Sequence, residues 1–503
     1  MGQGNMKYTN PIIRGFHPDP SICRVGDDYY LVNSSFEYFP GIPVFHSKDL
    51  VNWTQIGNCV KRADKFPLDR VKDSGGIWAP TIRHEKGIFY VTATLEKYGN
   101  FIITSADPAG EWSDPVWVEM GGIDPSLYFE NGKAYYCTNE SLHPGKEEIS
   151  MAEIDASTGT LLSEKRTIWC GVGGGHLEAP HVYHIDGWYY LIAAEGGTFF
   201  NHMITMARSR SIWGPYESCP WNPVLTNAHD TSKEVLCTGH GDLFRDHFGN
   251  WWIVHLGTRI SRRTMTHLGR ETFLTPVVWK DGWPVVENRK AVLISEGPLW
   301  AGQEKPKKWN ADFSRENWEP EWIFLRNPRG LSYKRGDGKL VLYPSTVTLR
   351  DGKNPTFAAV RQRDFESETD TEFIFDPCRD GDEAGIAILL SSDFHYTFCK
   401  KKTPDGNVLV VEKRAEDFHQ VAYCAPVQDG ILRLKVCCSK EYYTFYYSVD
   451  DVPYKQVCTA STRFLSCEVA GKCFTGTVIG LYTVSSGETE AFMEVLKFSN
   501  NPL

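Results

Sequence analysis

The chain has 503 residues, which is too long for one ordinary hydrophobic core and predicts two or more domains. Its formal net charge of −10 at pH 7 argues against a nucleic-acid partner, because phosphate binding needs clustered Lys and Arg. No stretch approaches the roughly 18 consecutive apolar residues of a membrane span. The polar segment Met1 to Pro11 lacks the hydrophobic core of an export signal. We therefore expect a cytoplasmic protein without membrane contact.

The fourteen cysteines show neither a CxxC pair nor the spacing of a zinc site. Cys437 and Cys438 are adjacent in a segment with strand character, so their side chains should point to opposite faces. In a protein without an export signal, we expect reduced and mostly buried thiols rather than a disulfide scaffold.

A fivefold repeat organises the first three hundred residues. Each copy begins with a short polar or acidic turn, usually with Pro, and continues through an apolar residue and a hairpin turn to paired aromatics. The copies are HPDPSICRVGDDYYLV (17–32), WAPTIRHEKGIFYVT (78–92), IDPSLYFENGKAYYCT (123–138), LEAPHVYHIDGWYYLI (177–192) and GHGDLFRDHFGNWWIV (239–254). The fifth copy has Gly241 where the others have Pro.

The spacing of these copies predicts the fold class. The turns GDD, EKG, ENG, IDG and FGN carry the Gly, Asn and Asp that tight hairpins require, and helical periodicity is nearly absent. Five β-units of about 45–60 residues fit a five-bladed β-propeller with about four strands per blade. We assign residues 8–300 to this domain; a β-sandwich of similar length is disfavoured because it would lack the recurrence.

A second all-β domain is predicted after the repeat ends. Residues 297–312 read as a linker with Pro and Lys, and short alternating strands with polar turns follow it, among them KLVLYP, AGIAILLS and TVIGLYTV. This pattern predicts a concanavalin-like β-sandwich over 310–503, an accessory domain comparable in size to small sugar-binding modules. A hydrophobic core alone explains the alternation, so no separate binding site is inferred there.

Three carboxylates occupy equivalent positions of the repeat. Asp19 and Asp124 directly precede the repeat Pro, and Glu178 stands one residue earlier. At this place the other two copies have Trp78 and His240. The innermost strands of a propeller converge on its axis, so these side chains should face one shared space. Any one of these acids alone would be read as a turn or surface residue. Three together repel one another unless they take different protonation states.

Cleavage of a glycosidic bond uses such a mixture of protonation states. One protonated acid gives its proton to the leaving oxygen, while an ionised carboxylate activates water or attacks the anomeric carbon. Trp78 would supply an apolar wall, and His240 a hydrogen-bonding or water-holding group. The competing use of converging carboxylates is a metal site, so a Ca²⁺ ion near the axis beside His240 stays open, although no EF-hand loop is present and no cofactor is required.

At these same residues the sequence resembles glycoside hydrolase family 43. The resemblance extends into the sandwich through DFSRENWEPEWIFLRNPRGLSY (312–333). Its propeller segments are NPIIRGFHPDPSI (10–22), GGIWAPTIR (75–83), GGIDPSLYFENGKAY (121–135), EAPHVYHIDGWYYLIAAEGGT (178–198), TGHGDLF (238–244) and LGRETFL (268–274). The resemblance implies an inverting mechanism in which Asp19 is the general base and Glu178 the general acid. Asp124 would then tune the pKa of the acid and position the substrate.

The resemblance also assigns the residues around the terminal sugar. The expected subsite consists of Phe36, Trp78, Thr198, His240 and Arg270. Where the family commonly has E-G-P-H, this chain has EAPH, with Ala179 in place of Gly, which could shift Glu178 slightly. In related two-domain enzymes a loop of the sandwich closes the pocket, but the sequence does not identify such a residue here.

We therefore expect an exo-acting β-1,4-xylosidase that releases terminal xylose from xylo-oligosaccharides. The main alternative is an α-L-arabinofuranosidase or a bifunctional enzyme, because xylopyranose and arabinofuranose present similarly spaced hydroxyls. A non-catalytic carbohydrate-binding propeller is less favoured because all three carboxylates are present, and a protein-interaction scaffold less still. The resemblance also suggests a homo-oligomer.

Overall fold

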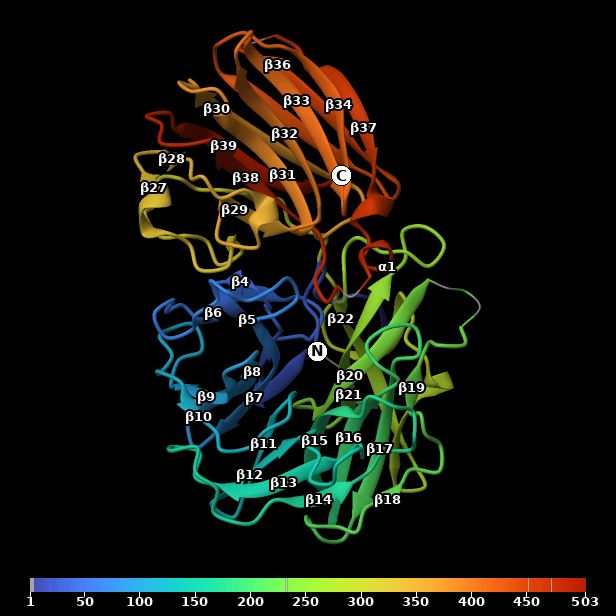
Figure 1. The fold of residues 1–503 in the computed structure, drawn as a ribbon. Coiled ribbons are helices and arrows are strands. Elements are labelled where there is room, and N and C mark those ends of the chain that lie inside the picture. Colours follow the sequence, from blue (N-terminus) through green and yellow to red (C-terminus); the bar gives the residue numbers. More distant parts are fainter. Residues whose placement is uncertain (1–3, 231, 233, 451, 472) are drawn as a thin grey trace.

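The computed structural model describes residues 4–230, 232, 234–450, 452–471 and 473–503 and consists almost entirely of β-strands (Figure 1). The first domain is a five-bladed propeller and the second is a sandwich of two large sheets, which confirms the predicted fold class. The strands of the blades, in chain order, are β2 (Ser21–Val25), β3 (Asp28–Val32), β5 (Gly41–Ser47) and β6 (Thr54–Val60); β7 (Ile77–Glu85), β8 (Ile88–Leu95), β9 (Gly99–Ser105) and β10 (Val116–Trp117); β11 (Ser126–Glu130), β12 (Lys133–Thr138), β13 (Ile149–Ile154) and β14 (Arg166–Trp169); β15 (Glu178–Ile185), β16 (Trp188–Glu195), β17 (Met203–Ser209), β18 (Glu217–Ser218) and β19 (Leu225–Thr226); and β20 (Val235–Arg245), β21 (Trp251–Arg259), β22 (Glu271–Lys280) and β23 (Trp283–Val286).

Each copy of the repeat forms the first two antiparallel strands of one blade. The second aromatic of a copy packs against the neighbouring blade. Tyr30 meets Phe89 edge to face with ring centroids 4.9 Å apart, and Tyr90 contacts Phe129 at the same distance. The recurring rings are therefore the hydrophobic contacts between blades, which explains why the repeat keeps them at one position.

The N-terminal segment closes the propeller. Strand β1 (Gly4–Thr9) pairs antiparallel with β24 (Ile294–Leu299), which follows the fifth blade. Asn10 donates from its side-chain amide to the Leu274 carbonyl (2.9 Å), and the Ile12 N–H donates to the Thr272 carbonyl (2.9 Å). The chain then enters the first blade at β2, so these bonds join the first blade to the last.

The sandwich has one seven-strand sheet path with β25 attached to β39, and a second path of eight strands. Its buried faces enclose a single apolar cluster that includes Trp322, Phe373, Leu434 and Phe498. Its strands are β25 (Trp309–Asn310), β26 (Ile323–Leu325), β27 (Tyr333–Gly336), β28 (Lys339–Leu342), β29 (Thr356–Arg361), β30 (Ser367–Phe375), β31 (Glu383–Ser391), β32 (Phe394–Thr403), β33 (Gly406–Ala415), β34 (Phe418–Pro426), β35 (Leu432–Cys438), β36 (Tyr442–Val449), β37 (Lys455–Ser461), β38 (Val478–Val484) and β39 (Met493–Pro502). The short helix α1 (Cys467–Ala470) and the 3₁₀ turns Glu287–Arg289, Gly330–Ser332, Leu349–Asp351 and Thr462–Leu465 complete the elements.

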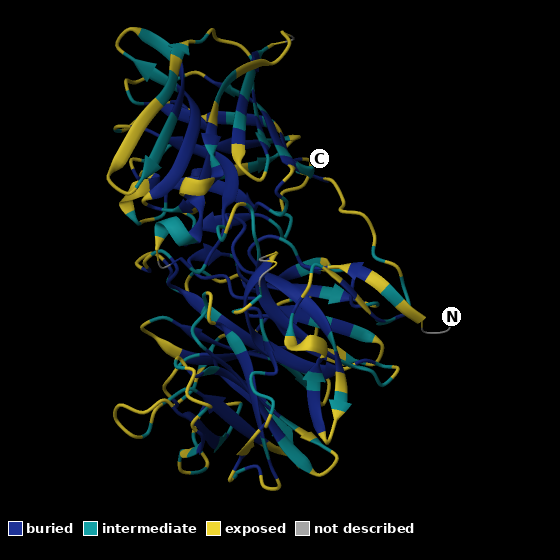
Figure 2. Ribbon diagram, turned by 90° about the vertical axis from the view of Figure 1, so that its right-hand side faces the viewer, coloured by how far each residue is buried: buried dark blue, intermediate teal, exposed yellow. Residues whose placement is uncertain are grey.

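The two domains share a sheet. The short strand β4 (Tyr38–Phe39), which lies within the propeller sequence, pairs antiparallel with β26 and forms the edge of the second sandwich sheet. Figure 2 shows that buried residues continue from one domain into the other across this junction. The fully buried Arg326 spans the junction: it donates to the Val71 and Lys353 carbonyls (2.8 and 2.9 Å) and pairs with Asp73 (3.0 Å).

The cysteine side chains agree with the sequence-based prediction. All fourteen are free thiols, and most are buried. Cys438 is buried while its neighbour Cys437 is partly exposed, as the alternation of β35 requires. Among the described residues, no helix has both the length and the apolar character needed to cross a membrane.

We expect Arg326→Met to lower the free energy of unfolding by about 2–4 kcal/mol, because it leaves buried carbonyls without their donors and Asp73 without its cation. Urea denaturation followed by tryptophan fluorescence measures the change. Arg329→Met is the control, since Arg329 is exposed three residues further along the same segment. Equal midpoints for both variants would contradict a structural role of Arg326 at the junction.

Candidate active site

The repeat places an unusual backbone conformation at the entrance of every first strand. The residue before the repeat Pro, or before Gly241 in the fifth copy, has a positive φ in all five blades: Asp19 (54°), Ala79 (43°), Asp124 (53°), Ala179 (54°) and His240 (51°). Non-glycine residues pay about 1–3 kcal/mol for such a conformation, and they cluster at functional sites. The first strands therefore bend where they reach the axis.

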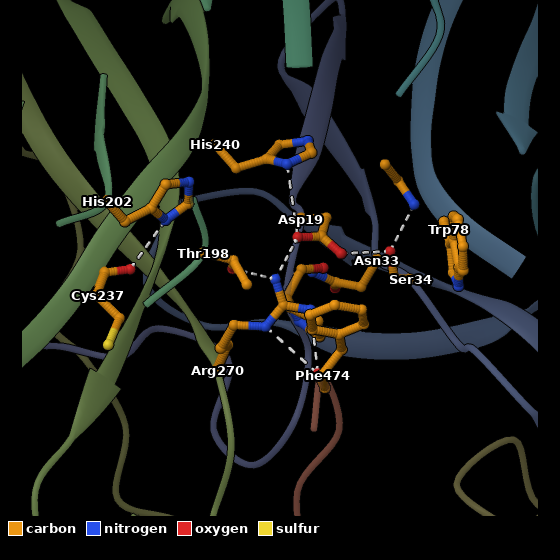
Figure 3. Close-up of polar contacts among 12 residues, drawn as sticks. Asp19, Asn33, Ser34, Trp78, Thr198, His202, Cys237, His240, Arg270 and Phe474 are labelled. Carbon is orange, nitrogen blue, oxygen red and sulfur yellow. Dashed lines mark hydrogen bonds and ion pairs between the residues drawn. The ribbon is translucent and has the colours of Figure 1, made fainter. Parts of the chain in front are cut away.

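Asp19 lies at the centre of the polar contacts in Figure 3. It is buried, and its Oδ2 accepts a hydrogen bond from the Ser34 hydroxyl at 2.5 Å. Its Oδ1 lies 3.1 Å from Nη1 of Arg270 and 3.5 Å from Nδ1 of His240. Burial alone would raise the pKa of Asp19, but Arg270, His240 and Ser34 together hold it below its ordinary value. Asp19 is thus ionised at neutral pH.

The other two carboxyl groups have the opposite electrostatic character. Burial, followed by the charge of Asp19, raises the pKa of Glu178 to about 7, although Arg270 works against this. Burial and then the charges of Glu178 and Asp19 raise the pKa of Asp124 well above its ordinary value. Asp124 also lies near the axis, with its Oδ2 4.0 Å from Nδ1 of His240. The site therefore combines an ionised carboxylate with two groups that tend to hold protons.

The five predicted subsite residues surround this cluster. Arg270 is buried and donates through Nη1 to the Thr198 hydroxyl (2.7 Å) as well as to Asp19. Its guanidinium also lies over the ring of Phe36, 5.6 Å from the centroid. Trp78 is partly exposed and donates its indole N–H to the Ser74 carbonyl (3.1 Å). The structure thus brings predicted site residues from all five blades into one region.

Two contacts of the site could not be found from the repeat. The Ser34 hydroxyl bridges Asp19 and the backbone N–H of Ala79 (2.6 Å), and so links the first two blades. The ring of buried His202 fills the space beside Gly239: a side chain at that glycine would come within about 2.4 Å of the ring. Neither Ser34 nor His202 stands at the repeat position that singled out the carboxylates.

The sandwich domain contributes Phe474 to the site. Its carbonyl accepts from Nε and Nη2 of Arg270 (3.3 and 3.0 Å), and its N–H donates to the Ser74 hydroxyl (2.9 Å). Its ring lies 6.1 Å from Phe36 and 6.4 Å from Phe199, measured between centroids. Phe474 is therefore a residue of the sandwich domain that contacts the site. Sequence reasoning did not identify it.

Ala179 stands where the sequence resemblance predicts a glycine. Its φ is 54°, a conformation that glycine adopts without steric cost and that costs alanine about 1–2 kcal/mol. Ala179 is buried, so the methyl group is accommodated and the strain falls on the backbone directly after Glu178.

The calcium ion considered beside His240 stays a prediction. Calcium takes six to eight oxygen ligands, and the carboxylate oxygens of Asp19 near His240 each accept one hydrogen bond, from Ser34 and from Arg270. Further along the axis a guanidinium is present, because Arg83 pairs with Asp242 at 2.8 Å. Within the described ranges, no group of three or more His, Cys, Asp or Glu side chains is arranged to hold a metal ion.

Comparisons with known proteins identify the family of the chain. Residues 8–284 match the model of glycosyl hydrolases family 43, and residues 310–498 match the beta xylosidase C-terminal concanavalin A-like domain. A non-reducing end alpha-L-arabinofuranosidase of Bacteroides ovatus is 38% identical, covering 96% of this chain and 92% of its own length. A xylosidase/arabinosidase of Butyrivibrio fibrisolvens is 34% identical, covering 96% of both chains.

A solved structure resembles the whole chain as well. The xylan beta-1,4-xylosidase of Bacillus halodurans superimposes with a TM-score of 0.92 at 29% identity, over 98% of this chain and 99% of that one. The family model and the full-length relatives confirm the resemblance found in the sequence: the chain belongs to glycosyl hydrolase family 43 and is a glycosidase.

Proposed function

We propose that this glycosidase is exo-acting and releases terminal xylose from short xylo-oligosaccharides with inversion of configuration. The observation that carries the proposal is the unlike protonation of two carboxyl groups: Asp19 is held ionised, whereas the pKa of Glu178 is raised to about 7. An inverting glycosidase needs such a pair, one group to accept a proton from water and one to donate a proton to the leaving oxygen.

The proposed reaction is a single displacement. Asp19 accepts a proton from a water molecule whose oxygen forms a bond to the anomeric carbon. The bond from that carbon to the leaving oxygen breaks, and Glu178 gives its proton to this oxygen. Arg270 and Ser34 hold Asp19 through one hydrogen bond to each carboxylate oxygen, which keeps the base ionised and oriented. Asp124 positions the sugar beside Glu178.

The contribution of the sandwich supports exo-action. Phe474 and the propeller residues Phe36 and Phe199 form an apolar group beside Arg270. A wall of this kind limits the length of chain that fits beyond the cleaved sugar. It also leaves the guanidinium of Arg270 in contact with both the wall and the base.

Arabinofuranosidase activity is the second candidate, alone or together with xylosidase activity. The names of the Bacteroides ovatus and Butyrivibrio fibrisolvens relatives include arabinofuranosidase and arabinosidase. One misplaced hydroxyl contact changes transition-state binding by only about 1–3 kcal/mol, so small differences in the pocket decide between the two sugars.

Initial rates on aryl β-D-xylopyranoside and aryl α-L-arabinofuranoside test the proposal. We expect higher kcat/KM on the xyloside, and Asp19→Ala should lower turnover by about 100- to 10,000-fold because it removes the ionised carboxylate that accepts the proton. Circular dichroism should show the variant folded. A preference for the arabinofuranoside would favour the second candidate, and an unchanged rate in Asp19→Ala would refute the proposed base.

The role of Glu178 has a different signature. Glu178→Ala should lose about 100- to 10,000-fold on xylobiose but retain much more activity on an aryl xyloside with a strongly acidic phenol, since that leaving group needs little protonation. Glu178→Gln is the isosteric control and should behave in the same way. Equal losses on both substrates would show that Glu178 is not the acid.

The pH dependence of kcat/KM should be bell-shaped. Glu178 must be protonated to act, so the rate falls as the pH rises through its pKa of about 7. Asp19 must be ionised, so the rate falls as the pH drops through its pKa, which lies below the ordinary value of 3.8. Steady-state kinetics across this range measure both limbs. A basic limb set by a group of pKa 9 or above would contradict the assignment of Glu178.

Arg270→Gln should move both limbs of this profile to higher pH. The guanidinium lowers the pKa of Asp19 and also that of Glu178, so its removal raises both. Arg270→Lys keeps the positive charge and is the matched control, with limbs close to those of the unmodified enzyme. A loss of rate without movement of the limbs would mean that Arg270 acts only by binding substrate.

A further inference from the structure

Two loops of the propeller border the candidate site beside its carboxyl groups, and we call them the rim loops. The first covers residues 139–148 and connects β12 to β13, and the second covers residues 170–177 and leads from β14 into Glu178. The side-chain oxygen of Asn139 accepts from the N–H of the residue before Asp124 at 2.8 Å. Each rim loop therefore has one end next to a carboxyl group of the site.

A buried glutamate holds each rim loop. Glu148 accepts from two backbone N–H groups of the first loop at 2.8 and 3.1 Å. Glu195 accepts from the N–H groups of Val172 and Gly174 in the second loop at 2.9 and 2.7 Å. Hydrogen bonds from backbone N–H groups to a carboxylate are among the stronger ones in proteins. The two loops are thus fixed, and so are the places where their exposed side chains begin.

One glutamate and one histidine join the rim loops to each other. Oε1 of Glu147 accepts from the backbone N–H of His176 at 2.8 Å, and both residues are exposed. His176 stands two positions before Glu178 and has a φ of 54°. Such a conformation is costly for a residue other than glycine and is found most often at functional sites. The bond places both side chains at the rim, next to the proposed acid.

Both side chains keep hydrogen-bonding atoms for a ligand. Within the described parts of the chain, nothing bonds to Oε2 of Glu147 or to either ring nitrogen of His176. The ring of His176 lies against Gly197, where an added side chain would come within 3.2 Å of it. The next residue is Thr198, whose hydroxyl accepts from Arg270 in the site. The free polar atoms therefore stand at the edge of the predicted sugar subsite.

The charge of Glu147 acts on the proposed acid. Burial and the charge of Asp19 are the larger causes of the raised pKa of Glu178, and Glu147 works in the same direction. Because the interaction between two charges weakens with distance, Glu147 lies near the carboxyl group that protonates the leaving oxygen. The sugar that carries this oxygen must then lie beside Glu147 during cleavage.

We propose that Glu147 and His176 bind the leaving sugar and make the enzyme specific for a sugar, rather than an apolar group, on that side of the cleaved bond. This inference rests on the proposed xylosidase function and names the residues that recognise the second half of the substrate. Glu147 accepts from one hydroxyl of the leaving sugar through Oε2, and a ring nitrogen of His176 bonds to another hydroxyl. An aryl group in the same place has no hydroxyl to offer.

The ratio of kcat/KM on xylobiose to kcat/KM on an aryl β-D-xylopyranoside tests the inference, since these substrates differ only on the leaving side. Rates are measured at about pH 5, below the pKa of Glu178 of about 7, so that the acid is protonated in every variant. His176→Ala should lower the ratio by about tenfold, because a hydrogen bond to the leaving sugar is lost.

Glu147→Gln is the second variant. The glutamine keeps an oxygen that can accept from the His176 N–H, so the rim loops stay joined even if His176→Ala disturbs them. We expect the ratio to fall by about three- to tenfold, because a neutral acceptor replaces a charged one. Glu490→Gln changes an exposed glutamate of the sandwich and is the matched control, with the ratio of the unmodified enzyme.

The outcomes separate this inference from the function on which it rests. Equal losses on both substrates, in variants that circular dichroism shows to be folded, would overturn the inference and leave the proposed xylosidase function intact. An unchanged ratio in both His176→Ala and Glu147→Gln would do the same. Failure of the unmodified enzyme to cleave xylobiose would overturn the proposed function and the inference with it.

Discussion

The carboxylate of Asp242 ties four of the five blades together on the propeller axis. It accepts from the Ser21 hydroxyl (2.7 Å), from Arg83 (2.8 Å) and from the Tyr183 hydroxyl (2.6 Å), while Arg83 also contacts Nδ1 of His181 (2.9 Å). Burial would raise the pKa of Asp242, but Arg83 and His181 hold it well below its ordinary value. The axis is therefore closed by a buried ion pair whose oxygens are all used, and such a pair is costly to break.

This network fixes the first strands directly below the site. Every blade that contributes a residue to it also contributes a site residue a few positions earlier in the chain: Ser21 follows Asp19, Arg83 follows Trp78, His181 follows Glu178, and Asp242 follows His240. The third blade is held differently, because the Thr81 hydroxyl donates to the carbonyl of Pro125, next to Asp124 (2.8 Å). The residues with positive φ lie where the first strands pass from this network to the site, and the bend they make turns the site residues toward one another.

The repeat made much of this predictable. Five recurring hairpins indicated the propeller, and equivalence within the repeat singled out Asp19, Asp124 and Glu178 without any structure. Residues outside the repeat position carry no such signal. Ser34 acts from the segment after the first hairpin, and Phe474 reaches Arg270 across 204 positions of sequence. The pairing of β4 with β26 could not be predicted either, because the two residues of β4 are too few to show a strand periodicity.

Arg270 explains why the sandwich matters to chemistry in the propeller. Its donors are divided among Asp19, Thr198 and the Phe474 carbonyl, which belong to the first blade, the fourth blade and the sandwich. The proposed base depends on this guanidinium for its charge, and the guanidinium depends on Phe474 for its orientation. Phe474 in turn is fixed through Ser74, whose carbonyl also holds Trp78. A domain without a proposed catalytic carboxylate of its own thus holds the guanidinium that keeps the proposed base ionised, which is a physical reason for the two domains to share a junction.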